Sequence, residues 1–92
     1  MPSYKSFATQ KFWEHYEHLP EDVRQLADKT YLLFKKNSAH PGLHFKKVGK
    51  KQPVYSVRVT DFYRALCLKQ QNNVYWFWIG DHISYEKMIG EL

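Results

Sequence analysis

The sequence has 92 residues, a hydrophobic content of 43% and a formal net charge of +5. A chain of this length buries roughly two-thirds of its unfolded surface, so one domain spanning residues 1–92 can fold without a metal or a disulfide. Residues 1–10 lack the apolar core of a signal peptide, and no run approaches the roughly 18 apolar residues that a membrane span needs. We therefore expect a soluble cytoplasmic protein with no membrane partner.

The single cysteine, Cys67, excludes an intrachain disulfide. It lies in an apolar run with Ala65, Leu66 and Leu68, which favours a buried thiol over a reactive one. A reducing compartment fits this use of cysteine.

The positive charge is concentrated in the middle of the chain, in three lysine pairs: Lys35–Lys36, Lys46–Lys47 and Lys50–Lys51. A cluster of one sign attracts polyanions or acidic protein partners. A solvated face that only aids solubility is an equally good interpretation of the lysines alone.

The first predicted helix follows Thr9, a residue type favoured at helix N-caps, and ends near Leu19-Pro20. Pro20 suits the first turn of a second helix, where two acidic residues would complement the positive end of the helix dipole. Helical spacing in this second helix is shown by Val23, Leu26, Ala27, Thr30, Tyr31 and Phe34. Asn37 to Gly42 provides the stop signal.

After Gly42 the apolar pattern changes to the period of two that is typical of strands. We predict strands at about 43–48, 54–59, 62–69 and 74–79. Helices followed by strands indicate an α+β fold, with two N-terminal helices covering one face of a curved, mainly antiparallel, four-stranded sheet.

The last predicted strand, Val74 to Ile79, is apolar at every position, as expected of a strand covered on both sides. Trp76, Phe77 and Trp78 are therefore expected in the core rather than on an RNA-stacking surface. For Tyr75 both interpretations stay open.

Arg58 and Arg64 are the candidate anion-binding residues. A three-residue loop, Thr60-Asp61-Phe62, would pair them on one sheet face, whereas a two-residue turn would place them on opposite faces. Two arginines directly opposite one another repel, and a bound phosphate would relieve that repulsion. Arginine suits this role because its planar fork grips phosphate oxygens in a bidentate manner.

His82 and Tyr85 follow the last strand and are the candidate proton-transfer pair. Histidine exchanges protons near neutral pH, with a reference pKa of about 6.5, and a tyrosine hydroxyl can donate or accept. The remaining histidines lack zinc-ligand spacing, and no glycine-rich phosphate loop opens either helix. We expect no metal and no nucleotide cofactor.

Taken in order, the two helices and four short motifs resemble the RelE/ParE superfamily of bacterial toxins. The motifs are Leu43-x-Phe45-Lys46-Lys47, Tyr55-Ser56-Val57-Arg58-Val59, Tyr63-Arg64 and Gly80-x-His82-x-x-Tyr85. The resemblance covers nearly the whole chain and implies the small α+β toxin fold with a short C-terminal helix.

The resemblance also implies the toxin of a type II toxin–antitoxin pair, with an antitoxin as partner. Its nearest functional branch is a ribosome-dependent endonuclease of messenger RNA. Arg64 would then contact the transition state, Arg58 would grip the phosphate, Lys46 or Lys47 would add charge, and His82 or Tyr85 would transfer protons.

Two other functions stay open at this point. Gyrase-poisoning members of the superfamily share the fold without a nuclease site, so the chain could act on DNA gyrase or another protein. It could also be a plain nucleic-acid binder that uses the lysine cluster, with an affinity that falls steeply as salt rises.

Overall fold

The computed structural model describes residues 4–92. Its elements, in chain order, are β1 (Lys5–Ala8), α1 (Gln10–Glu17), α2 (Glu21–Lys36), the short 3₁₀ helix η1 (Pro41–Leu43), β2 (Lys46–Lys47), β3 (Val54–Thr60), β4 (Tyr63–Gln70), β5 (Asn73–Asp81) and α3 (His82–Gly90).

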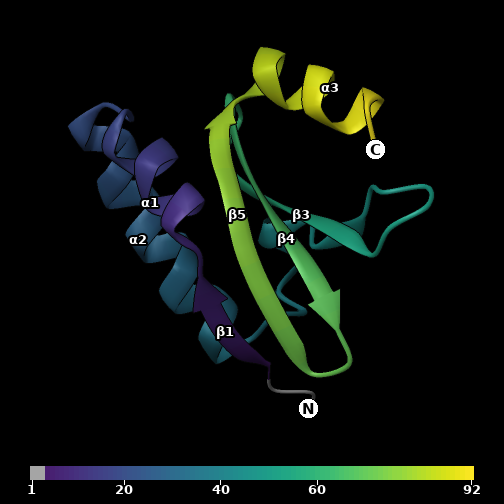
Figure 1. Ribbon diagram of the computed structural model, residues 1–92. Coiled ribbons are helices and arrows are strands. Elements are labelled where there is room, and N and C mark those ends of the chain that lie inside the picture. Colours follow the sequence, from purple (N-terminus) through teal and green to yellow (C-terminus); the bar gives the residue numbers. More distant parts are fainter. Residues whose placement is uncertain (1–3) are drawn as a thin grey trace.

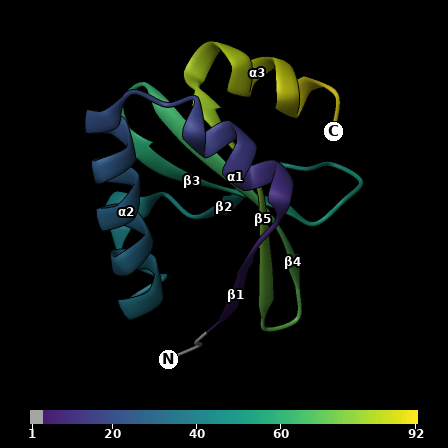
Figure 2. The ribbon, with the colours of Figure 1, turned by 60° about the vertical axis from the view of Figure 1, so that its left-hand side comes forward.

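The strands form one sheet in the order β1-β5-β4-β3-β2. β1 runs parallel to β5, and the other neighbouring strands are antiparallel. Helices α1 and α2 lie along one face of the sheet, while α3 crosses the opposite face near the end of β5 (Figures 1 and 2). The expected α+β architecture is confirmed. In the described part of the chain, no helix combines the length and apolar character of a membrane span.

The sheet has five strands instead of four, because the segment before α1 adds a parallel edge strand. β1 pairs with β5 from Lys5 opposite Asn73 to Ala8 opposite Trp76. Ser6 strengthens this contact, since its hydroxyl oxygen accepts from Trp76 Nε1 at 2.8 Å. Four residues without a clear period of two give little sequence signal for a strand.

The strand expected at 43–48 is also shorter than predicted. Only Lys46–Lys47 pairs with β3. Leu43 ends the η1 turn, and His44 adopts a left-handed backbone conformation with φ of 49°. This backbone reversal delays the start of the strand.

Helix boundaries follow the sequence signals closely. Thr9 is the N-cap of α1, and its Oγ1 accepts from the backbone N–H of Phe12 at 3.2 Å. Pro20 precedes α2 as its N-cap residue, one position earlier than its expected place in the first turn, and Asn37 ends the helix.

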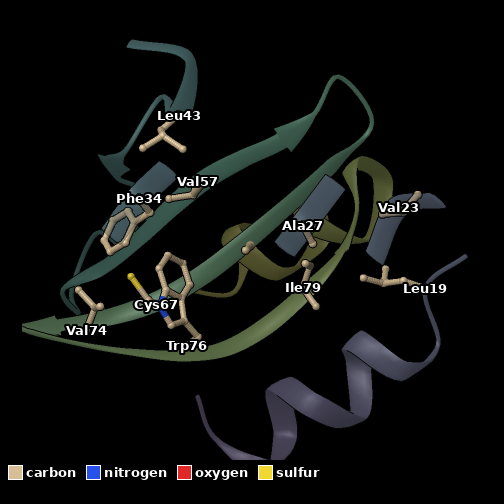
Figure 3. Packing of buried hydrophobic residues seen from close by; sticks show 11 residues of the cluster. Leu19, Val23, Ala27, Phe34, Leu43, Val57, Cys67, Val74, Trp76 and Ile79 are labelled. Carbon is tan, nitrogen blue, oxygen red and sulfur yellow. The ribbon is translucent and has the colours of Figure 1, made fainter. Parts of the chain in front are cut away.

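The main core fills the space between α1, α2 and the sheet (Figure 3). Its buried members are Leu19, Val23, Ala27, Phe34, Leu43, Val57, Ala65, Cys67, Val74, Trp76 and Ile79. Cys67 is fully buried, as expected. Burial also raises the pKa of its thiol to about 12, so the thiol is unreactive near neutral pH.

A smaller core lies between the sheet and α3, formed by Val54, Leu66, Trp78 and Tyr85. A β-bulge in β5 lets this strand contribute a tryptophan to each core. Trp78 pairs with Leu66 and Trp76 pairs with Cys67, so Phe77 between them has no partner on β4. This irregularity turns the two tryptophans to opposite faces. Both are buried, which confirms their expected core positions, whereas Phe77 is only partly buried.

Candidate active site

Arg58 and Arg64 lie directly opposite one another on β3 and β4. The shared face is therefore as expected, but the turn is different. Thr60 pairs with Tyr63, which leaves a two-residue turn, and a register shift between Arg58 and Thr60 leaves Val59 unpaired. This β-bulge restores the pairing that a regular two-residue turn would have prevented.

Both arginines belong to the sheet face that α3 covers in part, hereafter the arginine face. It continues across β5, where Gly80 pairs with Arg64. On the other side, Lys46 pairs with Ser56 and Lys47 with Tyr55. Because side chains alternate along a strand, Lys46 shares the arginine face and Lys47 belongs to the opposite face.

Each guanidinium group already has partners from the protein. Arg58 forms an ion pair with Asp61, and its Nη1 lies 3.4 Å from Nε2 of His44. Arg64 donates from Nη1 to the backbone oxygens of Thr60 at 2.6 Å and Tyr63 at 3.0 Å. A guanidinium has five N–H donors, so Arg64 keeps donors for an anion.

The start of α3 is fixed by a capping interaction at the end of β5. Asp81 is the N-cap, and its Oδ1 accepts from the backbone N–H of Ser84 at 2.8 Å. This hydrogen bond lowers the pKa of the Asp81 carboxyl group. The backbone N–H of His82 donates to the oxygen of Phe62 at 2.8 Å, which ties α3 to the β3–β4 turn.

Tyr85 points from α3 into the smaller core and is only 5% exposed. Its hydroxyl donates to Oγ of buried Ser56 at 3.3 Å. The guanidinium carbon of Arg64 lies 6.0 Å from the centre of the Tyr85 ring, within cation–π range. The ring of Tyr85 therefore packs against the guanidinium group of Arg64, while its hydroxyl points into the smaller core.

His82 stacks on Tyr85 with ring centres 5.7 Å apart. Its Nε2 lies 3.1 Å from Oε1 of Glu86. A carboxylate accepts hydrogen bonds, so Nε2 is the donor in this contact. Nδ1 is buried and has no hydrogen-bond partner within residues 4–92.

Sequence reasoning did not find several residues that contact the candidate site, among them Asp61, the ion-pair partner of Arg58. Glu86 follows His82 by four residues, a spacing that would have indicated the contact once α3 was assigned. Ser56 lies two positions before Arg58 on β3, so the two side chains share the arginine face. His44 reaches Arg58 only through its left-handed backbone, for which the sequence offers no signal.

A family model described as the ParE-like toxin domain matches residues 21–87. The match extends from the first residue of α2 into α3 and includes both arginines, His82 and Tyr85. The chain belongs to the ParE-like toxin family, and it is a toxin of the toxin–antitoxin class. A search of curated proteins found no match.

Solved structures of the same fold come from archaea and bacteria. The chain superposes on the RelB–RelE antitoxin–toxin complex of Methanococcus jannaschii with a TM-score of 0.68 and 15% identity, covering 89% of this chain and 96% of that chain. For the RelBE2 toxin–antitoxin complex of Mycobacterium tuberculosis the TM-score is 0.69 with 14% identity, over 87% and 99% of the two chains.

The intact RelBE complex of E. coli is similar with a TM-score of 0.63 and 14% identity, over 85% of this chain and 95% of that chain. At such identities the likeness establishes the fold, and the chemistry has to be argued from this chain's own residues.

Proposed function

We propose that this toxin is an endonuclease that cuts messenger RNA on the ribosome and uses the arginine face as its active site. The observation that carries this proposal is the apposition of Arg58 and Arg64 across one strand pair. Like charges directly opposite one another in a sheet destabilise it, and a phosphodiester between the two guanidinium groups would replace that repulsion with charge-assisted hydrogen bonds.

The proposed reaction is attack of the ribose 2′-hydroxyl on the adjacent phosphorus. The O2′–P bond forms and the P–O5′ bond breaks, while a base takes the 2′ proton and the departing 5′ oxygen gains one. General acid–base catalysis contributes about 10²- to 10⁴-fold in rate. One preorganised donor aimed at the developing charge contributes about 10²- to 10³-fold.

In this scheme Arg64 contacts the phosphoryl oxygens in the transition state, and Arg58 grips the phosphate. Lys46 adds positive charge, since it shares their sheet face and Lys47 does not. His82 is assigned the proton transfer through Nε2, because its side chain is 45% exposed whereas Nδ1 is buried. The buried Tyr85 is instead assigned to positioning Arg64 and His82.

The proposed dependence on the ribosome fits a site whose parts are partly exposed. Arg58 is 36% exposed, and its ion-pair partner Asp61 lies in the β3–β4 turn. Holding the substrate in a reactive geometry is a large part of catalysis, and a ribosome that fixes the messenger RNA would supply that positioning.

A cognate antitoxin is the second proposed partner. The similar structures of Methanococcus jannaschii, Mycobacterium tuberculosis and E. coli are complexes of an antitoxin and a toxin. With a net charge of +5, this chain would attract an acidic segment that covers the arginine face. Folding of a partly disordered partner on binding would fit this role.

Purified ribosomes programmed with a defined messenger RNA test the proposed activity. The wild-type protein should cut the RNA only in the presence of ribosomes, and Arg64→Ala should not cut at all. A wild-type protein that leaves the message intact, while still arresting growth when expressed, would contradict the proposal.

The family description favours a second candidate, since the matching model is named for ParE. In this alternative the protein inhibits DNA gyrase without cutting RNA. A supercoiling assay with purified gyrase separates the two, because only this alternative predicts inhibition by the wild-type protein and by Arg64→Ala alike.

A further inference from the structure

Phe62 is an exposed aromatic residue beside the arginine face. It lies in the two-residue turn between β3 and β4, two positions from Arg64, and is 72% exposed. It belongs to neither hydrophobic core. Within residues 4–92, no other aromatic ring pairs with its phenyl ring. A single exposed apolar residue is common on protein surfaces, so exposure alone assigns no role.

The backbone of Phe62 is held on both sides, although its side chain is free. Its N–H donates to Oγ1 of Thr60 at 3.1 Å, and its carbonyl oxygen accepts from the backbone N–H of His82 at 2.8 Å. The same turn is fixed to Arg64, which donates to the carbonyl oxygen of Thr60. A phenyl ring has only two side-chain torsions, so ordering this flat surface against a ligand costs little entropy.

We propose that Phe62 stacks on a nucleobase of single-stranded RNA next to the phosphate bound by Arg58 and Arg64, an inference that rests on the proposed function. A nucleotide combines an anion with a flat aromatic ring. The protein offers the complementary combination of two cations and an exposed phenyl ring within one hairpin. Stacking on an aromatic side chain tolerates every base, so Phe62 would position the RNA strand without selecting its base sequence.

Binding of an uncleavable RNA tests this role separately from catalysis. The probe is a single-stranded oligonucleotide of mixed sequence with 2′-methoxy groups throughout, and its dissociation constant is measured by fluorescence anisotropy. Phe62→Leu keeps an apolar side chain but removes the ring, and should weaken binding about 5- to 150-fold, the range for one stacked base. Phe62→Trp should bind at least as tightly as wild type.

Ile83→Ala is the matched control. Ile83 is also 72% exposed, and it adjoins His82, whose backbone N–H contacts Phe62. Its loss should change the affinity for RNA by less than twofold. Salt dependence adds a second control: Phe62→Leu should leave the log–log slope unchanged, whereas Arg58→Gln should reduce it by about 0.7 for the lost phosphate contact.

Each outcome decides the inference. Equal affinity of Phe62→Leu and wild type overturns it, whether or not the protein cuts RNA. A loss of affinity for a purified antitoxin alone, with RNA binding unchanged, also overturns it, because Phe62 would then be a protein contact. If Phe62→Leu weakens RNA binding while wild type fails to cut ribosome-bound message, the stacking contact stands and the proposed nuclease activity falls.

Discussion

Arg58 lies directly opposite Arg64 although only two residues form the turn between their strands. The unpaired Val59 supplies the extra residue that brings both guanidinium groups to one sheet face. The same hairpin supplies partners for both arginines. Arg58 forms an ion pair with Asp61, and Arg64 donates to the backbone oxygens of Thr60 and Tyr63. The hairpin therefore positions both arginines of the proposed phosphate site and also supplies Asp61, whose carboxylate balances part of their charge.

Arg64→Lys tests whether the forked guanidinium matters beyond its charge. Lysine keeps the charge but loses the fixed fork of donors, so we expect cleavage to fall by about 10²-fold or more. Initial rates on programmed ribosomes measure the effect. Arg24→Lys on α2 is the matched control, because Arg24 is the one remaining arginine in the sequence; its rate should equal that of wild type.

Asp61→Asn tests the charge balance of the site. Asp61 is 69% exposed, and an exposed ion pair contributes only about 0–1 kcal/mol to stability. The variant should therefore melt within a few degrees of wild type. Its RNA affinity should rise, since Arg58 no longer has a competing carboxylate. Anisotropy titrations at two salt concentrations check this, and weaker binding would show that Asp61 orients Arg58 for its ligand.

Tyr85→Phe separates positioning from proton transfer. The change removes the hydrogen bond to Ser56, so the free energy of unfolding should fall by about 0.5–1.5 kcal/mol. The cleavage rate should stay within a few-fold of wild type, because the ring beneath Arg64 and His82 is retained. A rate loss of about 10²-fold or more in a folded variant would return the proton-transfer role to Tyr85.

The stability of the protein should fall at alkaline pH because of Cys67. Its pKa is raised to about 12 by burial, against about 8.5 in an unfolded chain. Well below pH 8.5 the thiol is protonated in both the folded and the unfolded state, so its contribution to the free energy of unfolding is fully present. Between about pH 9 and 12 only the unfolded state ionises, so this contribution falls by about 1.4 kcal/mol per pH unit.

Urea denaturation of wild type and Cys67→Ala across this range isolates the cysteine from other titrating groups. The difference between their unfolding free energies should narrow or reverse as the pH rises. Curves that stay parallel would mean that the native protein ionises the thiol as readily as the unfolded chain does.

The sequence carried the features that local chemistry determines. The cap at Thr9, the buried tryptophans of β5 and the face shared by Arg58 and Arg64 were all predicted from residue types and spacing. The hairpin pairing was right for a different reason, because a bulge at Val59 replaced the expected three-residue loop. Bulges depend on pairing across strands, which a single strand's pattern does not encode.

The features that the sequence missed depend on contacts distant along the chain. β1 exists because β5 offers it an edge and because Trp76 donates to Ser6, 70 residues away. The sequence predicted Tyr85 as part of a proton-transfer pair with His82, yet its position on α3 directs its hydroxyl into the core beside Ser56. Such assignments need the packed structure.

The 5′ ends of transcripts, mapped across the transcriptome after brief expression in growing cells, test the central claim most directly. If the arginine face is a ribosome-dependent nuclease site, new ends will appear within coding regions at a fixed phase relative to the codons, and Arg64→Ala will produce none. Growth arrest without new ends, or ends that ignore the reading frame, would contradict the account.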